Sequence, residues 1–245
     1  MKHERTYRHL VRSVRLQSFQ VVVKETDLLI HASTNLAENA RELVLQHRGY
    51  IEAYLKRYPA FGRTLEPWYL DGPAPEIVTR MTLAGQKAAV GPMAAVAGAI
   101  AEQVGRGLLS FTDEVIVENG GDIFLKSQGP VTIGLFAGKS PLSLRFGIRL
   151  EGSQTPQAVC TSSGTVGHSL SLGRADAVCV ISESCPLADA AATSIGNLIQ
   201  SKADIHKAFA VGQKIEGITG LAVIVDDELG VWGELKVLPL NIKKG

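Results

Sequence analysis

The sequence predicts an α+β protein with two antiparallel sheets, each covered by helices. The first observation is the order of the expected elements: a strand pair, two helices and another strand pair, in roughly the same order again from Val131 onward. The second is Asn119-Gly120 between two apolar runs, a strong hairpin signal. The third is length, because 245 residues suffice for a sizeable core. We therefore expect a single domain of residues 1–245, built from two similar halves at about 1–128 and 129–245.

Composition and charge narrow the class of protein. Hydrophobic residues make up 45% of the chain and charged residues 20%, which is typical of a globular protein. A net charge of +1 is too small to attract nucleic acid or a membrane surface electrostatically, so neither is an expected partner. The N-terminal segment lacks the apolar core of a signal peptide, and the longest apolar run, 88–101, is too short to span a bilayer. Three cysteines do not make a disulfide framework, and we expect a cytoplasmic location.

The first half shows strand, helix and hairpin signals in turn. Partial alternation predicts a strand over 11–23, and a polar turn leads to a second strand over 28–32. Apolar residues then recur at helical spacing over 36–58, and Pro59 ends this helix. Residues 60–77 are rich in proline and show little periodicity, as in a functional loop or lid. A helix of small residues over 93–104 and a hairpin over 115–118 and 123–126 complete this half.

The second half is expected to open with a strand pair over 131–137 and 144–150. A polar loop at 161–164 precedes the apolar, β-branched segment 175–181, which is typical of a buried strand. Ser184 and Pro186 predict the start of a helix, because serine favours the N-cap and proline the first turn. We expect a further helix over 202–209 and a closing hairpin over 221–225 and 230–235.

Asp189 and Thr193 are the sharpest candidate pair. They stand four positions apart on the expected helix, so their side chains share one face. A carboxylate and a hydroxyl are hard oxygen ligands, suited to Mg²⁺ or Ca²⁺. Spacing alone leaves an alternative open, in which Asp189 complements the positive end of its own helix and Thr193 is a packed helical residue.

Small-residue turns form a second kind of candidate site. Residues 161–164 offer hydroxyls and backbone N–H groups that suit an anion, and Gly120-Gly121 permits close approach of a ligand to the backbone. Plain turns explain the same residues. His168 lies in a glycine-flanked loop as a candidate acid or base, and a histidine without function is the alternative. No Walker loop, H-E-x-x-H or G-x-S-x-G motif is present.

Three of these segments occur in an order that resembles the ApbE family of Mg²⁺-dependent flavin transferases. The segment 119–122 resembles the family's N-x-G-G turn, 161–164 its A-T-S-G turn, and 188–193 its D-A-x-A-T metal-binding helix. The resemblance implies a duplicated T-fold-like α+β unit and Mg²⁺ held by Asp189 and Thr193. The residues that it implies for FAD, FMN or another phosphate-bearing ligand are Asn119, Gly120, Gly121, Asp122, Thr161, Ser162, Ser163 and Gly164.

The chain also departs from the family pattern. Ala97 stands where the family's A-K-G segment has lysine, with Gly98 as its glycine, and Ser171-Leu172 stand where its H-x-x-D-P segment has Asp-Pro. Groups of this kind position a leaving phosphate, so their loss weakens transfer more than binding. We therefore expect a short, divergent branch that binds a flavin or nucleotide-type small molecule with Mg²⁺ and transfers flavin to protein poorly. A non-catalytic binding module and a structural protein on the same fold remain alternatives.

Overall fold

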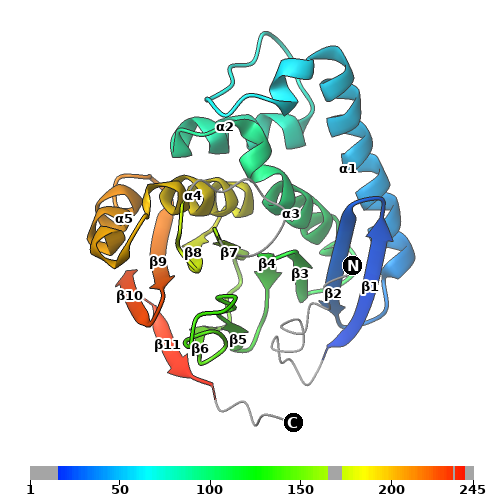
Figure 1. Ribbon diagram of the computed structural model, residues 1–245. Coiled ribbons are helices and arrows are strands. Elements are labelled where there is room, and N and C mark those ends of the chain that lie inside the picture. Colours follow the sequence, from blue (N-terminus) through cyan, green and yellow to red (C-terminus); the bar gives the residue numbers. More distant parts are fainter. Residues whose placement is uncertain (1–15, 165–172, 234, 241–245) are drawn as a thin grey trace.

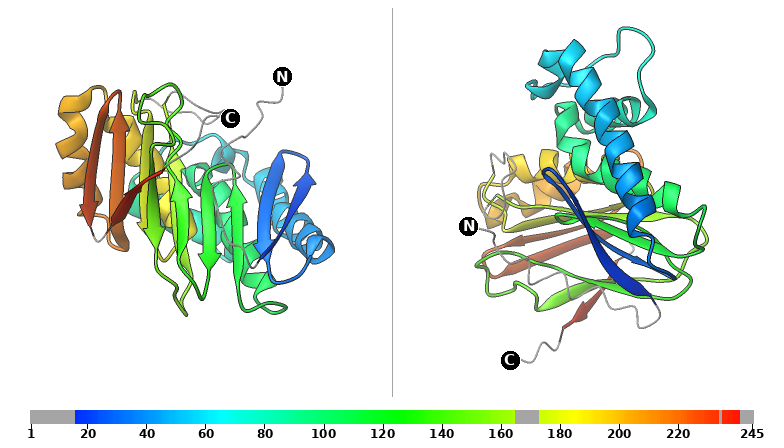
Figure 2. Two further views of the ribbon diagram at one scale, coloured as in Figure 1. Left: turned by 90° about the horizontal axis from the view of Figure 1, so that it is seen from below. Right: turned by 90° about the vertical axis from the view of Figure 1, so that its right-hand side faces the viewer.

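The computed structural model describes residues 16–164, 173–233 and 235–240, and its central element is an eight-stranded antiparallel sheet (Figures 1 and 2). The strands lie in the order β1-β2-β3-β4-β7-β8-β9-β10. Their bounds are β1 Gln17–Val23, β2 Thr26–Ala32, β3 Val115–Asn119, β4 Asp122–Lys126, β7 Gln157–Ser162, β8 Ala177–Ser182, β9 Ile218–Val225 and β10 Glu228–Gly233. The two groups of four meet where β4 pairs with β7, with Ile123 opposite Val159.

A smaller antiparallel sheet lies against one face of the large one (Figure 1). It has the order β11-β6-β5, with β5 Val131–Gly134, β6 Phe146–Leu150 and β11 Lys236–Pro239. Ile133 and Ile148 are opposite one another in register and share an apolar cluster with Ile116 of β3 and Cys179 of β8. The two sheets therefore enclose a core of their own.

The helices cover the opposite face of the large sheet (Figure 2). Their bounds are α1 Ala37–Arg57, α2 Glu76–Ala88, α3 Val96–Leu108, α4 Cys185–Leu198 and α5 Ile205–Gly212, with short 3-10 turns η2 Pro59–Gly62, η3 Pro92–Ala95 and η4 Lys202–Asp204. Strand alternation explains the layering, because Val115 and Val117 of β3 join the core beneath the helices while Ile116 joins the other core. Apolar side chains on both faces of these strands therefore require a covering layer on each side.

The arrangement of sheets and helices differs from the sequence expectation. Two antiparallel sheets are present, but the described helices pack on the large sheet, and the small sheet is covered by that sheet instead. The predicted strand pair over 131–137 and 144–150 exists as β5 and β6 but does not open a second helix-covered sheet. It pairs with β11, and its apolar residues face the outer side of the large sheet.

Two local elements also differ from the sequence expectation. Thr161 and Ser162 end strand β7, paired with Cys179 and Val178, whereas their sequence predicts a loop. Their small hydroxyl side chains concealed a strand that is fixed only by pairing with β4 and β8. Helix α2 is not among the expected helices, and its first two residues, Glu76 and Ile77, fall in the segment expected to be irregular. The helix begins directly after Pro75, which is its N-cap.

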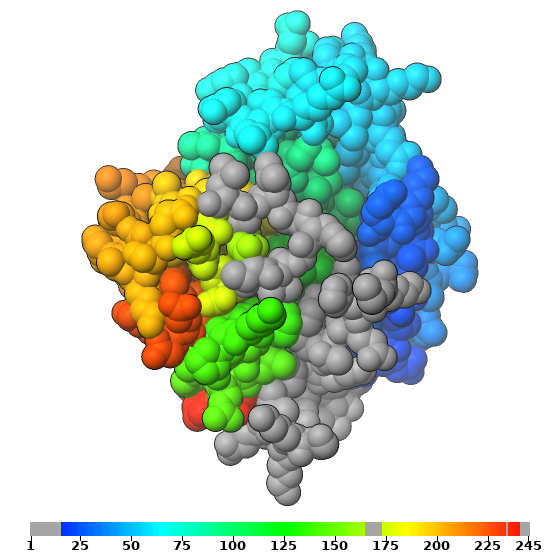
Figure 3. All heavy atoms as spheres, in the orientation of Figure 1, coloured from blue at the N-terminus to red at the C-terminus, as the bar shows by residue number. Residues whose placement is uncertain are grey.

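The connection after α1 forms one end of the molecule (Figure 3). Aromatic contacts hold it down: the Trp68 ring meets Phe61 edge-on at 5.8 Å, and its indole Nε1 donates to the Tyr54 hydroxyl at 3.4 Å. The Gln86 side chain of α2 donates to the Trp68 carbonyl at 2.8 Å. The segment is therefore packed against α1 and α2.

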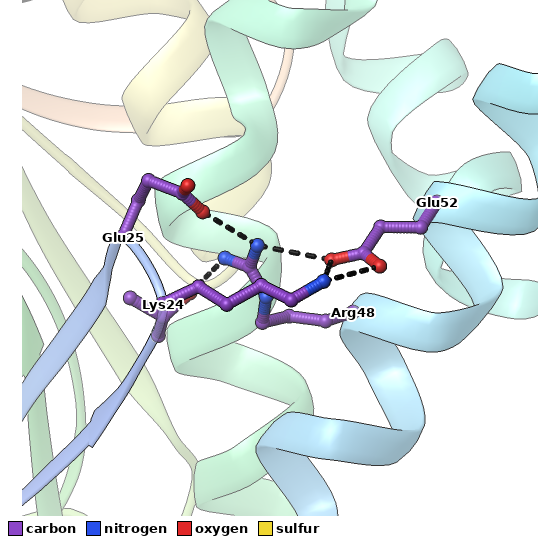
Figure 4. A network of polar contacts seen from close by, with 5 residues as sticks. Lys24, Glu25, Arg48 and Glu52 are labelled. Carbon is purple, nitrogen blue, oxygen red and sulfur yellow. Dashed lines mark hydrogen bonds and ion pairs between the residues drawn. The ribbon is translucent and has the colours of Figure 1, made fainter.

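A charged network ties the β1–β2 turn to helix α1 (Figure 4). Arg48 donates to Glu25 at 2.7 Å and to Glu52 at 3.0 Å, and Lys24 binds Glu52 at 2.8 Å. The Arg48 side chain is 16% exposed, whereas that of Glu25 is 83% exposed. Pairs this close to solvent each stabilise a fold by less than about 1 kcal/mol, so the network orients the turn more than it stabilises the fold.

Within the described ranges, no single helix has the length and apolarity needed to cross a membrane; the bent pair Glu76–Ala88 and Pro92–Leu108, which meet at 108°, passes on length and composition alone.

Candidate functional site

The β3–β4 turn forms one wall of the candidate site. Gly120 and Gly121 are its two central residues, with φ of 70° and 125°, and Asn119 and Asp122 close the ladder beside it. Positive φ at both central positions is what a tight hairpin turn requires, and glycine adopts it without strain. The Asn119 side chain donates to the Ala97 carbonyl at 3.0 Å, so the turn is fastened to the start of helix α3.

The end of β7 lies beside this turn. The Thr161 N–H donates to the Gly121 carbonyl at 3.2 Å. Thr161, Ser162 and Ser163 are half-buried, and Gly164 is exposed. The Gly164 N–H donates to Ala175 at 2.9 Å. The structure thus brings the 119–122 and 161–164 segments together, as the resemblance implied for a shared site.

Helix α4 supplies Asp189 and Thr193. Both are half-buried, on a helix whose other residues from Cys185 to Ala192 are all buried. The helix packs against β7, β8 and α3. The buried small residues allow this close packing. Asp189 and Thr193 lie one turn apart on the same, less buried face of the helix.

Asp189 contacts the N-terminus of another helix. Its Oδ2 accepts a hydrogen bond from the Gly98 N–H at 2.9 Å, in the first turn of α3. The N-cap residue of α3, Ala95, has no side chain able to cap it, so Asp189 supplies an acceptor that the helix start lacks. Gly98 permits this approach, because a Cβ there would lie 2.5 Å from the Cys185 carbonyl oxygen. The carboxylate therefore complements α3 rather than only its own helix.

Glu102 makes the matching contact in the opposite direction. Its side chain is fully buried, and Oε2 accepts a hydrogen bond from the Cys185 N–H, the first residue of α4, at 2.8 Å. Its Oε1 accepts from Arg80 at 2.9 Å and Arg106 at 2.8 Å. Each of the two helices thus caps the start of the other. Sequence analysis missed this role, although a glutamate within a run of small residues was a visible signal.

Two acidic groups at this junction favour their protonated forms. Burial raises the pKa of Asp189 to about 7, against the opposing hydrogen bonds from the Gly98 and Ala97 backbone. Burial, followed by the negative charge of Asp189, holds the pKa of Asp122 well above its usual range, against a hydrogen bond from Cys160. Asp189 keeps some contact with solvent, but protein surrounds it closely enough to disfavour its charge. A cation between such carboxylates would relieve both effects.

Two thiols lie near the carboxylates. Cys160 and Cys185 are buried, with their Sγ atoms 3.5 Å apart, and the Cys160 thiol donates to the Cys185 carbonyl at 3.4 Å. Burial raises the pKa of Cys185 to about 11 and that of Cys160 well above its ordinary value. Neutral thiols are poor nucleophiles and poor metal ligands, so we interpret these two as small apolar residues that pack at the junction.

The donor set suits a hard cation. The described residues contain no group of three or more His, Cys, Asp or Glu side chains able to hold a metal ion. A cation here would therefore combine Asp189 with oxygens of other kinds, such as the Thr193 hydroxyl, a backbone carbonyl, water or a ligand phosphate. Oxygen donors of this type fit Mg²⁺. His168, Ser171 and Leu172, which the sequence analysis also named, lie outside the described residues.

Comparisons with known proteins show the family of the chain. A family profile described as "AbpE bacteria" matches residues 8–225. The UPF0280 protein of Methanocaldococcus jannaschii is 40% identical over 231 residues, covering 92% of this chain and 94% of its own length. That of Methanosarcina barkeri is 41% identical over 217 residues, covering 87% and 85%.

Solved structures show the same fold. The flavinyl transferase ApbE of Pseudomonas stutzeri superposes with a TM-score of 0.60 at 13% identity, covering 89% of this chain and 94% of that one. The ApbE protein of Thermotoga maritima gives a TM-score of 0.57 at 15% identity, covering 89% and 97%.

Proposed function

The chain belongs to the AbpE bacteria family, and we propose that it binds a flavin or another nucleotide-type phosphate ligand together with Mg²⁺. The site is the junction of the β3–β4 turn, the end of β7 and the first turns of α3 and α4. One observation carries the proposal: Asp189 reaches the N-terminus of α3 at 2.9 Å, beside the Gly120-Gly121 turn, which Thr161 contacts at 3.2 Å.

Each residue has a distinct part in this proposal. Asp189 and Thr193 hold the cation, which would neutralise phosphate charge and orient the ligand. The glycine turn leaves room for a ligand to approach the backbone, and Thr161, Ser162 and Ser163 offer hydroxyl groups to phosphate oxygens. Asn119 fixes the turn against α3 through its bond to Ala97. Asp122 interacts electrostatically with Asp189, so it adds a second carboxylate whose charge a cation would compensate.

Flavin transfer to protein is a weaker candidate than binding. Solved structures with this fold include flavin transferases, which supports a flavin as the ligand class to test first. Ala97 provides no cation at the start of α3, where the family resemblance implies lysine. Loss of one charge that stabilises a transition state costs on the order of a hundredfold in rate. A non-catalytic binding module is therefore the second candidate, and His168 remains a proposed acid or base.

We further propose that the two halves arose by duplication of one T-fold-like unit. The first half has the order β1, β2, helices, β3, β4, and the second has β7, β8, α4, α5, β9, β10. In each half the four strands are neighbours in the sheet in that order. The pair β5 and β6 would then be an insertion between the halves. We also propose a cytoplasmic location.

A binding experiment tests the function directly. FAD, FMN and ATP are titrated into the full chain by calorimetry, each with excess Mg²⁺ and with EDTA. We expect Mg²⁺-dependent binding of at least one nucleotide, and its loss in Asp189→Asn. Incubation with FAD, Mg²⁺ and a threonine-containing acceptor domain should give little covalent flavin. No nucleotide binding under either condition would overturn the proposal, and rapid flavinylation would overturn its second half.

A further inference from the structure

We propose that Glu102 is a positioning residue, which holds the first turn of α4 in place and so sets the location of the Asp189 carboxylate. This inference rests on the proposed cation site. It concerns a residue that touches neither the cation nor the ligand, and it assigns a function to a buried charge that the binding proposal does not use.

The carboxylate of Glu102 replaces a missing cap. Helix α4 has Ser184 at its N-cap, but the serine side chain makes no capping hydrogen bond. The Cys185 N–H instead donates to Glu102 Oε2 at 2.8 Å. A charged acceptor at the N-terminus of a helix also complements the helix dipole. The start of α4, which Ser184 and Pro186 predict, is therefore capped by a residue of α3 and not by its own N-cap side chain.

The link between Cys185 and Asp189 is short and stiff. Asp189 is four positions after Cys185, so it lies one turn along the same face, at a rise of about 6 Å. In the opposite direction, Asp189 accepts a hydrogen bond from the N–H of Gly98 in α3, four positions before Glu102. The two contacts form a closed pair: α3 holds the start of α4, and α4 holds the start of α3.

The helices α3 and α4 are in close contact at Gly98, so a small displacement of α4 changes the contacts of Asp189. A Cβ on Gly98 would lie 2.5 Å from the Cys185 carbonyl oxygen and 2.9 Å from Asp189 Cβ. Rotation or sliding of α4 would therefore break a contact or create a clash. With the Glu102 contact removed, the first turn of α4 loses the bond that fixes it in this position, and Asp189 moves with it.

Two arginines keep Glu102 in its orientation. Arg80 of α2 and Arg106 of α3 both donate to Oε1, at 2.9 Å and 2.8 Å, and this leaves Oε2 directed at Cys185. Arg80 also binds Glu76 at 2.9 Å. The arginine side chains are 34% and 42% exposed, whereas that of Glu102 is fully buried. Helix α2 is thereby coupled to the cation site through one buried carboxylate.

The test compares two glutamates of similar chemistry. Glu102→Gln keeps an acceptor oxygen but removes the charge shared with the arginines. Glu114→Gln is the matched control, because Glu114 also accepts a backbone N–H, that of Gln128 at 2.8 Å, outside the site. The Mn²⁺ dissociation constant is measured by paramagnetic resonance on the full chain, with MnCl₂ as probe in the presence of FAD, and melting temperatures are recorded alongside.

We expect Glu102→Gln to weaken Mn²⁺ binding by about ten- to a hundredfold, the usual effect of losing a group that orients a metal ligand. Glu114→Gln should leave the constant within about twofold of the wild-type value. In the Asp189→Asn background, Glu102→Gln should cause no further loss. Arg106→Gln gives a milder perturbation and should weaken binding in the same direction if Glu102→Gln fails to fold.

The outcomes separate the two proposals. Wild-type protein that fails to bind Mn²⁺ would overturn the cation site, and this inference with it. Wild-type binding with an unchanged constant in Glu102→Gln would overturn the positioning role alone. A loss in Glu102→Gln that Glu114→Gln matches, with the melting temperature lowered equally in both variants, would also overturn it, because the effect would then reflect general destabilisation.

Discussion

Replacement of Asp189 by asparagine should stabilise the cation-free protein at high pH. The folded-state pKa is raised from 3.8 to about 7, so between these values the folded chain holds a proton that the unfolded chain has released. Stability therefore falls as pH rises through this window and stays low above it. A pKa unit corresponds to about 1.4 kcal/mol, which limits the cost of the ionised carboxylate to about 4 kcal/mol. Asparagine removes the charge but keeps an oxygen for the Gly98 N–H. We therefore expect the variant to have a free energy of unfolding about 1–3 kcal/mol higher than that of the wild type at pH 8.

Urea unfolding in EDTA at pH 4 and pH 8 provides the measurement. Asp189→Asn should match the wild type at pH 4, where the wild-type carboxyl is protonated in the folded state, and exceed it at pH 8. Mg²⁺ at a hundred times its dissociation constant should then stabilise the wild type by about 2.7 kcal/mol and leave the variant unchanged. Asp113→Asn, at an exposed position, controls for the loss of one negative charge. A variant less stable than the wild type at pH 8 in EDTA, or an equal difference at both pH values, would refute the reasoning.

Three further changes probe the same junction. Gly98→Ala should lower the free energy of unfolding by about 1–3 kcal/mol in urea titrations, because its Cβ would press on the Cys185 carbonyl; an unchanged midpoint would contradict the close helix contact. The thiols of Cys160, Cys179 and Cys185 should react with a disulfide reagent at pH 8 only after unfolding, because they are buried and their pKa values are raised. Rapid labelling of the native protein would show that solvent reaches these thiols. Thr193→Val keeps the side-chain shape and removes an oxygen, so it should weaken Mg²⁺-dependent FAD binding about tenfold without lowering the melting temperature. Equal affinity of the variant and the wild type would show that Thr193 is not a ligand of the cation.

Sequence reasoning succeeded where local signals decide the structure. Asn119-Gly120-Gly121 predicts a tight hairpin because two consecutive positions need positive φ, and the turn has this form. The helix ending before Pro59 and the strand of β8 follow from the loss of an N–H donor and from β-branched side chains. The failures have a different cause. Strand β7 and the placement of β5 and β6 depend on pairing between segments far apart in the chain, which no local pattern reveals.

The same division applies to the candidate site. Asp189, Thr193 and the glycine turn were identifiable because their residue types and spacing carry the chemistry. Their neighbours were not, since Glu102 reaches Cys185 across 83 positions of sequence, and Asp189 reaches Gly98 across 91. Ser184 and Pro186 predict where α4 begins, but the groups that cap the starts of α3 and α4 lie on the other helix of the pair. Reciprocal capping is a property of the packed pair of helices.

Charge at the junction also decides the order in which ligands would bind. The N-terminus of α3 faces the Asp189 carboxylate, and that of α4 faces Glu102, so both positive helix ends are already complemented. Asp122 adds a carboxylate whose pKa is raised by burial and by Asp189. A phosphate approaching this arrangement alone would meet acidic groups and no uncompensated helix end. If the proposed cation site is correct, we therefore expect the cation to bind before the phosphate or together with it. A nucleotide should then bind only weakly in EDTA.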